Sequence, residues 1–435
     1  MNSHRSLKTF ALTLILLFVT RAGAQATPAR GPKRVVVHAG HVLDVRTGRM
    51  LSDQTIVIEG DRIVSVGASS QNPAGANLID LPNATVLPGL IDSHDHLTDS
   101  PRDFNFGLLT NSAPRLALEG AANARATLLA GFTTVRNVGE WGWTDTALRD
   151  AINDGDVPGP RMLVSGPAVG ITGGHCDINE LAPEFHVSSD SVADGIAAVQ
   201  KKVREEIKYG ADLIKVCVTG GIMSKGDDPR ASQFTYEELK AIVADAHRLG
   251  RKVAGHAHGS EGIRWAAEVG FDSVEHGSFI DDAGIALMKQ HGTYLVPTLY
   301  PGEWLLENGE KVGLPPYMAA KARQVLPQAR KNIAHAIASG VKIAFGTDAS
   351  NFPHGLNAHE FPLLVQVGMT PLEAIQAATL NAADLLGWSD RVGALEPGKY
   401  ADLIAVDGDP LQDITTLERV KFVMKGGEVV KNEYR

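Results

Sequence analysis

The alternation of short apolar runs with amphipathic segments constrains the fold of this chain more than any other feature of its sequence. Eight runs have the length and composition of buried strands: 86–95, 133–138, 161–165, 213–218, 252–257, 273–276, 294–298 and 341–347. Segments with helical periodicity separate them, for example 191–210 and 235–250, and these end at glycine. Strands that alternate with helices usually pair in parallel. Eight such strands predict a (β/α)8 TIM barrel.

The two ends of the chain follow a different pattern. From residue 33 to 67, and again after residue 390, short β-branched runs are separated by Gly and Asp turns. A chain of 435 residues has room for one large domain and a smaller one. We therefore predict a small β-sandwich built from 33–85 and 390–435, and place the barrel over 86–389.

The first 24 residues have the composition of a secretory signal peptide. Arg5 and Lys8 precede an apolar run over 10–19, and small residues end the segment at Ala24. The run is short for a permanent membrane anchor, although an uncleaved anchor is the alternative. We expect cleavage after Ala24 and a periplasmic or secreted protein, with no membrane association afterwards.

Charge and cysteine content limit the classes of partner. The formal net charge is −9, and loss of the three basic residues in 1–24 lowers it to −12. An acidic protein has no electrostatic reason to bind nucleic acid or an anionic lipid surface. The two cysteines, Cys176 and Cys217, are interpreted as structural or cavity-lining thiols rather than as a disulfide.

The first predicted barrel strand carries a His-x-His pair. His94 and His96 follow the apolar run that starts at Val86. Residues two apart on a strand point to the same face, so two imidazoles converge as the first two ligands of a divalent metal would. Alternatively, both are ordinary half-buried strand residues.

Polar residues at the ends of other predicted strands complete this pattern. Lys215 lies in an apolar run, where a bare ammonium must be paired, deprotonated or modified. Strand five ends with His256 and His258, and strand six ends with His276. Strand eight ends with Asp348. Taken alone, each histidine and the aspartate could be an ordinary polar residue with its hydrogen bonds made within the chain. Lys215 alone could be a lysine whose amine reaches the barrel mouth. Together they lie at the C-terminal ends of strands, where TIM barrels carry their chemistry.

These motifs resemble the amidohydrolase superfamily over nearly the whole chain after residue 24. The resemblance rests on PGLIDSHDH, the strand-four lysine, HAHG, VEHG, GTD and the C-terminal GALEPGKYADLIAVDGDPL. TTVRNVG, TGGH, GGIMSKGDDP and SQFT are similar to the branch that contains Xaa-Pro dipeptidases and ochratoxin A hydrolases. The chain departs from that branch at Asn137, usually Asp, and at Lys225, near which a Pro is usual.

The resemblance implies a binuclear site with two divalent metal ions, expected to be zinc. The implied ligands are His94, His96 and Asp348 for one ion, His256 and His276 for the other, and carbamylated Lys215 as the bridge. Asp348 would also move a proton from the attacking water to the leaving amine. His258 is left as a rim residue that contacts substrate, and Cys217 as packing.

The residues expected to contact substrate lie on loops around the barrel mouth. His175 is implied near the substrate carbonyl or carboxylate. Arg136 either pairs with a substrate carboxylate or forms an internal salt bridge. Tyr300 and His354 contact substrate or are loop surface, and Phe234 and Trp304 with Tyr300 would form an aromatic rim. The stretch 220–234 is interpreted as a flap.

The predicted function is therefore hydrolysis of an amide bond to a C-terminal amino acid in a small-molecule or peptide substrate. N-acyl amino acids and dipeptides are the expected class, and the most specific hypothesis is ochratoxin A, split into its isocoumarin acid and phenylalanine. The alternatives are a cyclic amidohydrolase acting on a hydantoin or imidazolone, an Xaa-Pro dipeptidase, a mononuclear deaminase, and a silent metal-binding scaffold. Resemblance also implies a homo-oligomer.

Overall fold

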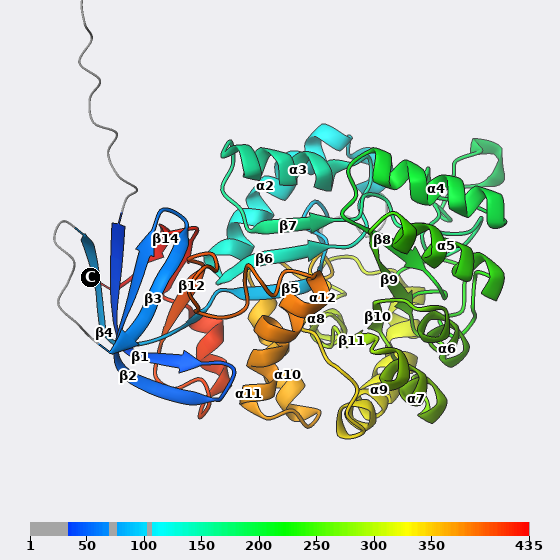
Figure 1. Cartoon of the computed structure of the whole chain (residues 1–435). Helices are drawn as coiled ribbons and strands as arrows, with labels where there is room; N and C mark the ends of the chain where they lie inside the picture. Colours follow the sequence, from blue (N-terminus) through cyan, green and yellow to red (C-terminus); the bar gives the residue numbers. More distant parts are fainter. Residues whose placement is uncertain (1–33, 69–75, 102–106, 435) are drawn as a thin grey trace, which may run out of the picture.

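The structure is a computed structural model that describes residues 34–68, 76–101 and 107–434. The predicted signal peptide lies outside these ranges. A sheet built from both ends of the chain stands at one side of a larger α/β body (Figure 1). In the described ranges, no helix combines the length and the apolar character needed to cross a bilayer.

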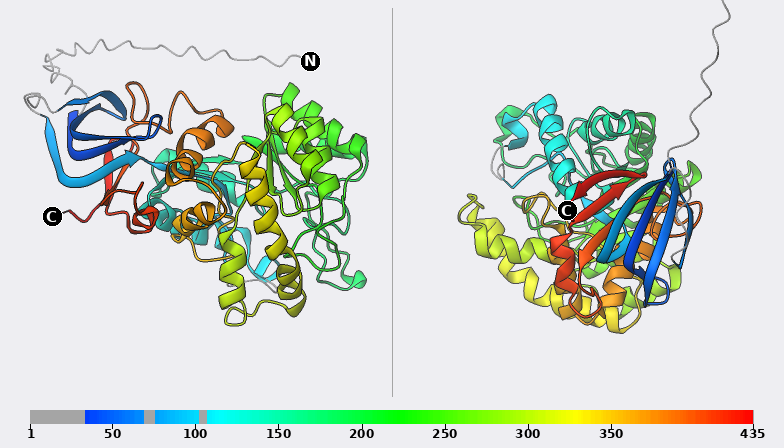
Figure 2. Two further views of the ribbon diagram at one scale, coloured as in Figure 1. Left: turned by 90° about the horizontal axis from the view of Figure 1, so that it is seen from below. Right: turned by 90° about the vertical axis from the view of Figure 1, so that its left-hand side faces the viewer.

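Seven strands from the two chain ends form one continuous sheet. They are β1 (Arg34–Asp44), β2 (Arg49–Glu59), β3 (Arg62–Ala68), β4 (Asn77–Pro88), β12 (Leu403–Asp407), β13 (Phe422–Lys425) and β14 (Glu428–Asn432), in the order β14-β13-β12-β4-β1-β2-β3. The C-terminal strands lie beside the N-terminal ones (Figure 2). The strands do not separate into two hydrogen-bonded sheets, because the long β4 pairs with β1 on one side and with β12 on the other.

The α/β body contains two parallel sheets whose strands are almost entirely buried. One has β5 (Leu90–Asp95), β6 (Phe132–Asn137) and β7 (Arg161–Val164); the other has β8 (Leu213–Cys217), β9 (Lys252–Ala257), β10 (Ser273–His276) and β11 (Tyr294–Val296). These seven strands coincide with the first seven predicted apolar runs. Runs of this kind are buried on both faces because helices cover parallel sheets.

Irregular segments join the two parallel sheets on both sides. The predicted eighth strand, 341–347, is extended chain with isolated bridges rather than a regular strand. It hydrogen-bonds to β11, where Leu295 N donates to Lys342 O at 2.8 Å, and to β5, where Ser93 N donates to Phe345 O at 2.8 Å. On the other side, Val169 N donates to Lys215 O of β8 at 2.8 Å. The C-terminal strand ends therefore meet around one mouth.

Helices connect and cover these strands. They are α1 (Gly107–Thr110), α2 (Ala113–Leu129), α3 (Thr144–Asp154), α4 (Ile196–Lys208), α5 (Tyr236–Arg248), α6 (Ser260–Val269), α7 (Asp282–His291), α8 (Tyr300–Asn308), α9 (Pro316–Ala338), α10 (Glu360–Gln366), α11 (Pro371–Gln376) and α12 (Ala382–Leu386). Helix α5 begins at a capping box, in which Thr235 and Glu238 satisfy each other's backbone N–H groups. Helices α8 and α9 form the long connection between β11 and the eighth extended segment.

One buried carboxyl of this framework has no hydrogen-bond partner in the described residues. Glu206, on α4, is 1% exposed, and neither of its oxygens is bonded. Burial raises the pKa of Glu206 to about 9, from an ordinary value of 4.5. The folded state thus keeps a proton that the unfolded chain loses as pH rises above 4.5. The contribution of this proton to stability is complete below pH 4.5 and is lost as pH rises through about 9.

We therefore expect Glu206→Gln to stabilise the protein at pH 8 by about 1–2 kcal/mol, because glutamine does not ionise. The difference in free energy of unfolding from wild type should shrink as pH falls toward 5. Denaturant unfolding at both pH values measures it. An equal effect at the two pH values would contradict the assignment.

Candidate metal centre

A cavity of about 720 Å³ opens at the C-terminal ends of the parallel strands. Its wall contains six histidines: His94, His96, His175, His256, His258 and His276. Lys215 and Asp348 line the same cavity. The structure thus brings together all the predicted metal ligands from strands that are far apart in the sequence.

The first group of candidate ligands is His94, His96 and Asp348, whose ligand atoms all lie within 4.8 Å of one another. Asp348 Oδ1 is 3.4 Å from His94 Nε2 and 3.2 Å from His96 Nε2. The other ring nitrogens are already used: His94 Nδ1 lies 2.8 Å from Glu275 Oε2, and His96 Nδ1 lies 2.8 Å from Gly139 O. Both Nε2 atoms therefore face a common point, as in metal sites whose ligands are oriented by outer hydrogen bonds.

The second group is His256, His258 and His276, again within 4.8 Å of one another. His258 was expected to be a rim residue outside the ligand set, but its ring lies beside those of His256 and His276, with centroids 4.7 and 4.9 Å away. Ser278 Oγ holds His258 Nδ1 at 2.7 Å, and Thr298 Oγ1 holds His276 Nδ1 at 2.7 Å. Burial and the neighbouring histidines lower the pKa of His256 and of His276 well below the ordinary value. Neutral imidazole is the form that binds metal.

Three residues at this mouth have left-handed backbone conformations. The φ angles are +69° for His276, +49° for Thr298 and +55° for Asp348. Such angles are uncommon outside glycine, and they are costly for a β-branched residue such as Thr298. They cluster at functional sites, where the surrounding structure maintains them.

Lys215 is electrostatically coupled to both groups. Its Nζ lies 3.5 Å from His94 Nε2, and its charge acts on His96, His256 and His276. Burial lowers the pKa of Lys215 to about 8, although Glu275 and Asp348 oppose the shift. A minor fraction of the amine is therefore neutral near physiological pH.

Sequence reasoning missed Glu275, which orients His94. It is completely buried and bonds His94 on one oxygen and Arg136 Nη2, at 2.8 Å, on the other. Burial opposes ionisation, but the Arg136 charge and the His94 hydrogen bond lower the pKa of Glu275 to about 2. The available signal was an acidic residue inside the buried run that ends at His276.

The prediction that Arg136 binds a substrate carboxylate is wrong in this structure. Its side chain is 3% exposed and does not line the cavity. The guanidinium donates to Glu275, to Ser273 Oγ at 2.9 Å and to Ser93 O. The alternative, an internal salt bridge, is what the structure contains.

Tyr300 and His354 also fail to reach the cavity. Tyr300 packs on Phe352 and His359, with ring centroids 4.7 and 5.0 Å away. His354 is buried, with Nδ1 3.3 Å from Asp95 Oδ1. Neither lines the cavity, and the same holds for Phe234 and Trp304 of the expected aromatic rim. The apolar wall comes instead mainly from α8 and α9: Leu305, Leu306, Met318, Leu326 and Ile333.

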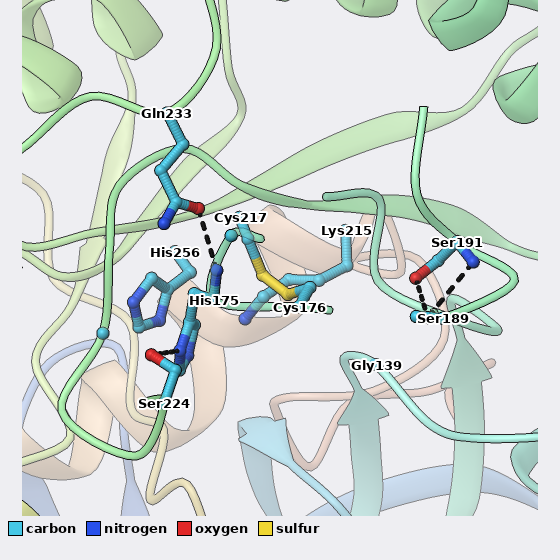
Figure 3. The surroundings of a disulfide bond; sticks show 12 residues. Gly139, His175, Cys176, Ser189, Ser191, Lys215, Cys217, Ser224, Gln233 and His256 are labelled. Atoms are coloured by element: carbon cyan, nitrogen blue, oxygen red, sulfur yellow. Dashed lines mark hydrogen bonds between the residues drawn. A yellow bond between two sulfur atoms is a disulfide. The ribbon is translucent and has the colours of Figure 1, made fainter. Parts of the chain in front are cut away.

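His175 does line the cavity, as predicted. Its ring stacks on His256 with centroids 4.2 Å apart, and its Nδ1 lies 2.8 Å from Ser224 Oγ (Figure 3). Burial lowers the pKa of His175 to about 4. The imidazole is therefore neutral at pH 7 in this arrangement.

Cys176 and Cys217 form a disulfide, contrary to the prediction of separate thiols (Figure 3). The loop after β7 folds against the end of β8 and brings the two Cα atoms to 6.1 Å, within the range that a disulfide spans. Both residues line the cavity. The bond links the segment next to His175 to the strand that carries Lys215. Cys217 is thus a cross-link rather than simple packing.

The two departures from the expected branch pattern have different surroundings. Asn137 accepts a hydrogen bond from Leu97 N at 2.7 Å and donates one to Glu140 at 3.1 Å. An aspartate at 137 would instead face the Glu140 carboxylate, so the amide suits its neighbour. Lys225 is exposed on the 220–234 loop.

Comparisons with known proteins identify the family of this chain. Residues 85–430 match the amidohydrolase family. Ochratoxinase from Aspergillus niger is 36% identical over 431 residues, covering 92% of this chain and 87% of that protein. Imidazolonepropionase from Streptomyces coelicolor is 28% identical over 385 residues, covering 82% and 86%.

Solved structures of similar proteins show the same family relationship. A Xaa-Pro dipeptidase with bound methionine in the active site has a TM-score of 0.87 at 39% identity, covering 92% of this chain and all of that one. A. niger ochratoxinase has a TM-score of 0.82 at 34% identity, covering 93% and 97%. These relatives imply a TIM barrel with a small additional domain. The chain belongs to the amidohydrolase family and is a hydrolase that acts on amide bonds.

Proposed function

We propose that this chain is a binuclear metal-dependent amidohydrolase that releases a C-terminal amino acid from an N-acyl amino acid or dipeptide. The observation that carries the proposal is the pair of neighbouring three-ligand groups with Lys215 coupled to both. Ochratoxin A is the most specific substrate that we propose. Two of the similar proteins bear the names ochratoxinase and Xaa-Pro dipeptidase.

The donor atoms fit two zinc ions. Imidazole nitrogens and a carboxylate are ordinary zinc ligands, and four of the histidine Nδ1 atoms are already held by protein groups. Addition of carbon dioxide to the neutral Lys215 amine, with loss of one proton from the nitrogen, would give a carbamate that could hold both ions. Its pKa of about 8 supplies the neutral amine. When bound, the ions would activate a water and polarise the scissile carbonyl.

Residues of the chain would transfer the proton and contact the substrate. Asp348 Oδ2 accepts a hydrogen bond from Asn351 Nδ2 at 2.8 Å, so Asp348 is held beside His94 and His96. From there it would take a proton from the attacking water and give it to the leaving amine. His175 would contact the substrate carbonyl or carboxylate. His258 would either complete the second group or contact the substrate.

The apolar wall supports a bulky acyl group. Side chains of α8 and α9 form one side of the cavity, and Trp141, Ile222 and Met223 also line it. Such a surface suits an aromatic or aliphatic acyl group better than a small polar ring. A cyclic amide remains the second candidate, because imidazolonepropionase is among the similar proteins.

Two further parts of the proposal concern closure of the barrel and the location of the protein. The hydrogen bonds that join β11 and β5 through 341–349 support closure of an eight-stranded barrel. Residues 1–24 would direct export to the periplasm or the medium. The Cys176–Cys217 disulfide supports an oxidising compartment.

Lys215→Ala should remove the bridge between the two groups. We expect bound metal, measured by elemental analysis, to fall below two ions per chain, and kcat/KM to fall by at least about 100-fold. Lys225→Ala, an exposed lysine of the flap, is the matched control and should resemble wild type. Two bound ions and full activity in Lys215→Ala would refute the bridging role.

A small substrate panel tests the substrate class. Products from ochratoxin A, N-acetyl-phenylalanine, several Xaa-Pro dipeptides and a hydantoin are identified by mass spectrometry. We expect free phenylalanine from ochratoxin A, because the apolar wall accommodates its aromatic acyl part. Opening of the hydantoin without cleavage of any linear amide would favour the cyclic alternative.

Glu275→Gln should weaken metal binding by about 10–100-fold, because the amide is a poorer acceptor for His94 Nδ1–H and leaves Arg136 without its counter-charge. Competition with a chelator measures the affinity. Glu206→Gln, which changes a buried carboxyl that does not line the cavity, serves as control. Unchanged affinity in Glu275→Gln would show that His94 is oriented without it.

A further inference from the structure

The 220–234 loop is clamped by a single lysine of α9. Lys321 Nζ donates to Gly221 O at 2.9 Å, to Ser224 O at 2.8 Å and to Asp227 Oδ1 at 2.6 Å. The Lys321 and Asp227 side chains are only 17% and 8% exposed. Three charge-assisted bonds from one ammonium fix the loop against α9, on the side where Ile222 and Met223 line the cavity.

Asp227 is the centre of this network. Besides Lys321, its carboxylate accepts from Gly221 N at 2.9 Å, from Ser224 Oγ at 2.7 Å and from Gln233 Nε2 at 3.4 Å. Burial opposes ionisation, but Lys321 and these hydrogen bonds lower the pKa of Asp227. The group is thus a carboxylate, which only accepts hydrogen bonds.

The network determines which nitrogen of His175 carries the proton. Ser224 Oγ–H donates to the Asp227 carboxylate, so its oxygen is left to accept from His175 Nδ1–H at 2.8 Å. The ring lines the cavity, and its Nε2 has no hydrogen-bond partner in the described part of the chain. Nε2 is therefore the nitrogen offered to a bound substrate.

Two further contacts fix the position of the ring. His175 N donates to Gln233 Oε1 at 3.0 Å, and the ring stacks on His256 (Figure 3). A Cβ at Gly221 would lie 2.2 Å from His175 Cε1, so only glycine lets the loop approach this closely. The loops after β7 and β8 are thus assembled around one imidazole.

We propose that Asp227, acting through Ser224 and anchored by Lys321, is a positioning residue that holds His175 as its Nδ1–H tautomer with Nε2 toward the scissile amide. The inference rests on the proposed amide hydrolysis for its kinetic consequence. The structural part concerns only hydrogen bonds within the chain. No metal ligand takes part in the relay itself.

Asp227→Asn is the sharpest variant, because it keeps the size of the side chain and changes the direction of the relay. An amide N–H can donate to Ser224 Oγ, which then donates to His175 Nδ1 and moves the ring proton to Nε2. We expect kcat to fall about 10–100-fold with KM changed less than about threefold. Metal content should equal that of wild type.

A double-mutant cycle with His175→Ala separates positioning from general damage. If Asp227 acts through His175, Asp227→Asn should change kcat less than about twofold in the His175→Ala background. Ser224→Ala should behave in the same way. Asp245→Asn, which disrupts a buried carboxylate paired with Arg204 and Arg248 away from the cavity, is the matched control and should leave kcat unchanged.

The tautomer gives a readout that does not depend on activity. In protein with 15N-labelled histidine, the His175 signal, assigned by its loss in His175→Ala, should show a protonated Nδ1 in wild type and a protonated Nε2 in Asp227→Asn. Protonated Nε2 in wild type, full kcat in Asp227→Asn, or a loss that multiplies that of His175→Ala would overturn the proposal. Absence of amide cleavage by the wild-type enzyme, with the expected tautomers present, would refute the proposed function alone.

Discussion

The candidate metal centre depends on an ion pair buried beneath it. Glu275 is fully enclosed between Arg136 and His94, and it holds both through separate carboxylate oxygens. Burying such charges is costly, and a pair of this kind contributes little to stability on its own account. Its effect here is orientation: one oxygen fixes His94 Nδ1, so that Nε2 points toward Asp348. An energetically costly interaction therefore orients His94, the first candidate metal ligand.

Similar hydrogen bonds orient other histidines around the cavity. Nδ1 is the nitrogen held by a protein group in five of the six cavity histidines: His94 by Glu275, His96 by Gly139 O, His175 by Ser224, His258 by Ser278 and His276 by Thr298. His256 differs, since it is Nε2 that lies near a protein group, at 3.4 Å from Gly220 O. Imidazoles fixed on one side present the other nitrogen without reorganisation, which favours both metal binding and catalysis.

The sequence predicts strands and faces well because both depend on local periodicity. His94 and His96, Lys215 and Asp348 were recognised because each follows or interrupts a buried run, and TIM barrels bring strand ends together. Partners are harder to predict, because they depend on distances between segments. Arg136 lies on a strand as expected, but its guanidinium donates to Glu275, some 140 residues later in the sequence. The Cys176–Cys217 disulfide is similar: its two residues are 41 apart in sequence and meet only when the loop after β7 folds back.

The parts that carry chemistry and those that contact the rest of a substrate are held differently. The candidate metal ligands lie at strand ends, in a framework of buried hydrogen bonds. The loops that hold His175 are fixed by the disulfide and by Lys321. The apolar wall comes largely from the α8–α9 connection, where Leu306 is 50% exposed although it lines the cavity. Under the proposed function, changes in that wall would alter the acyl group that fits without disturbing the candidate metal ligands. One fold can host different activities when the residues around its site change, and this chain is similar in fold both to an ochratoxinase and to a Xaa-Pro dipeptidase.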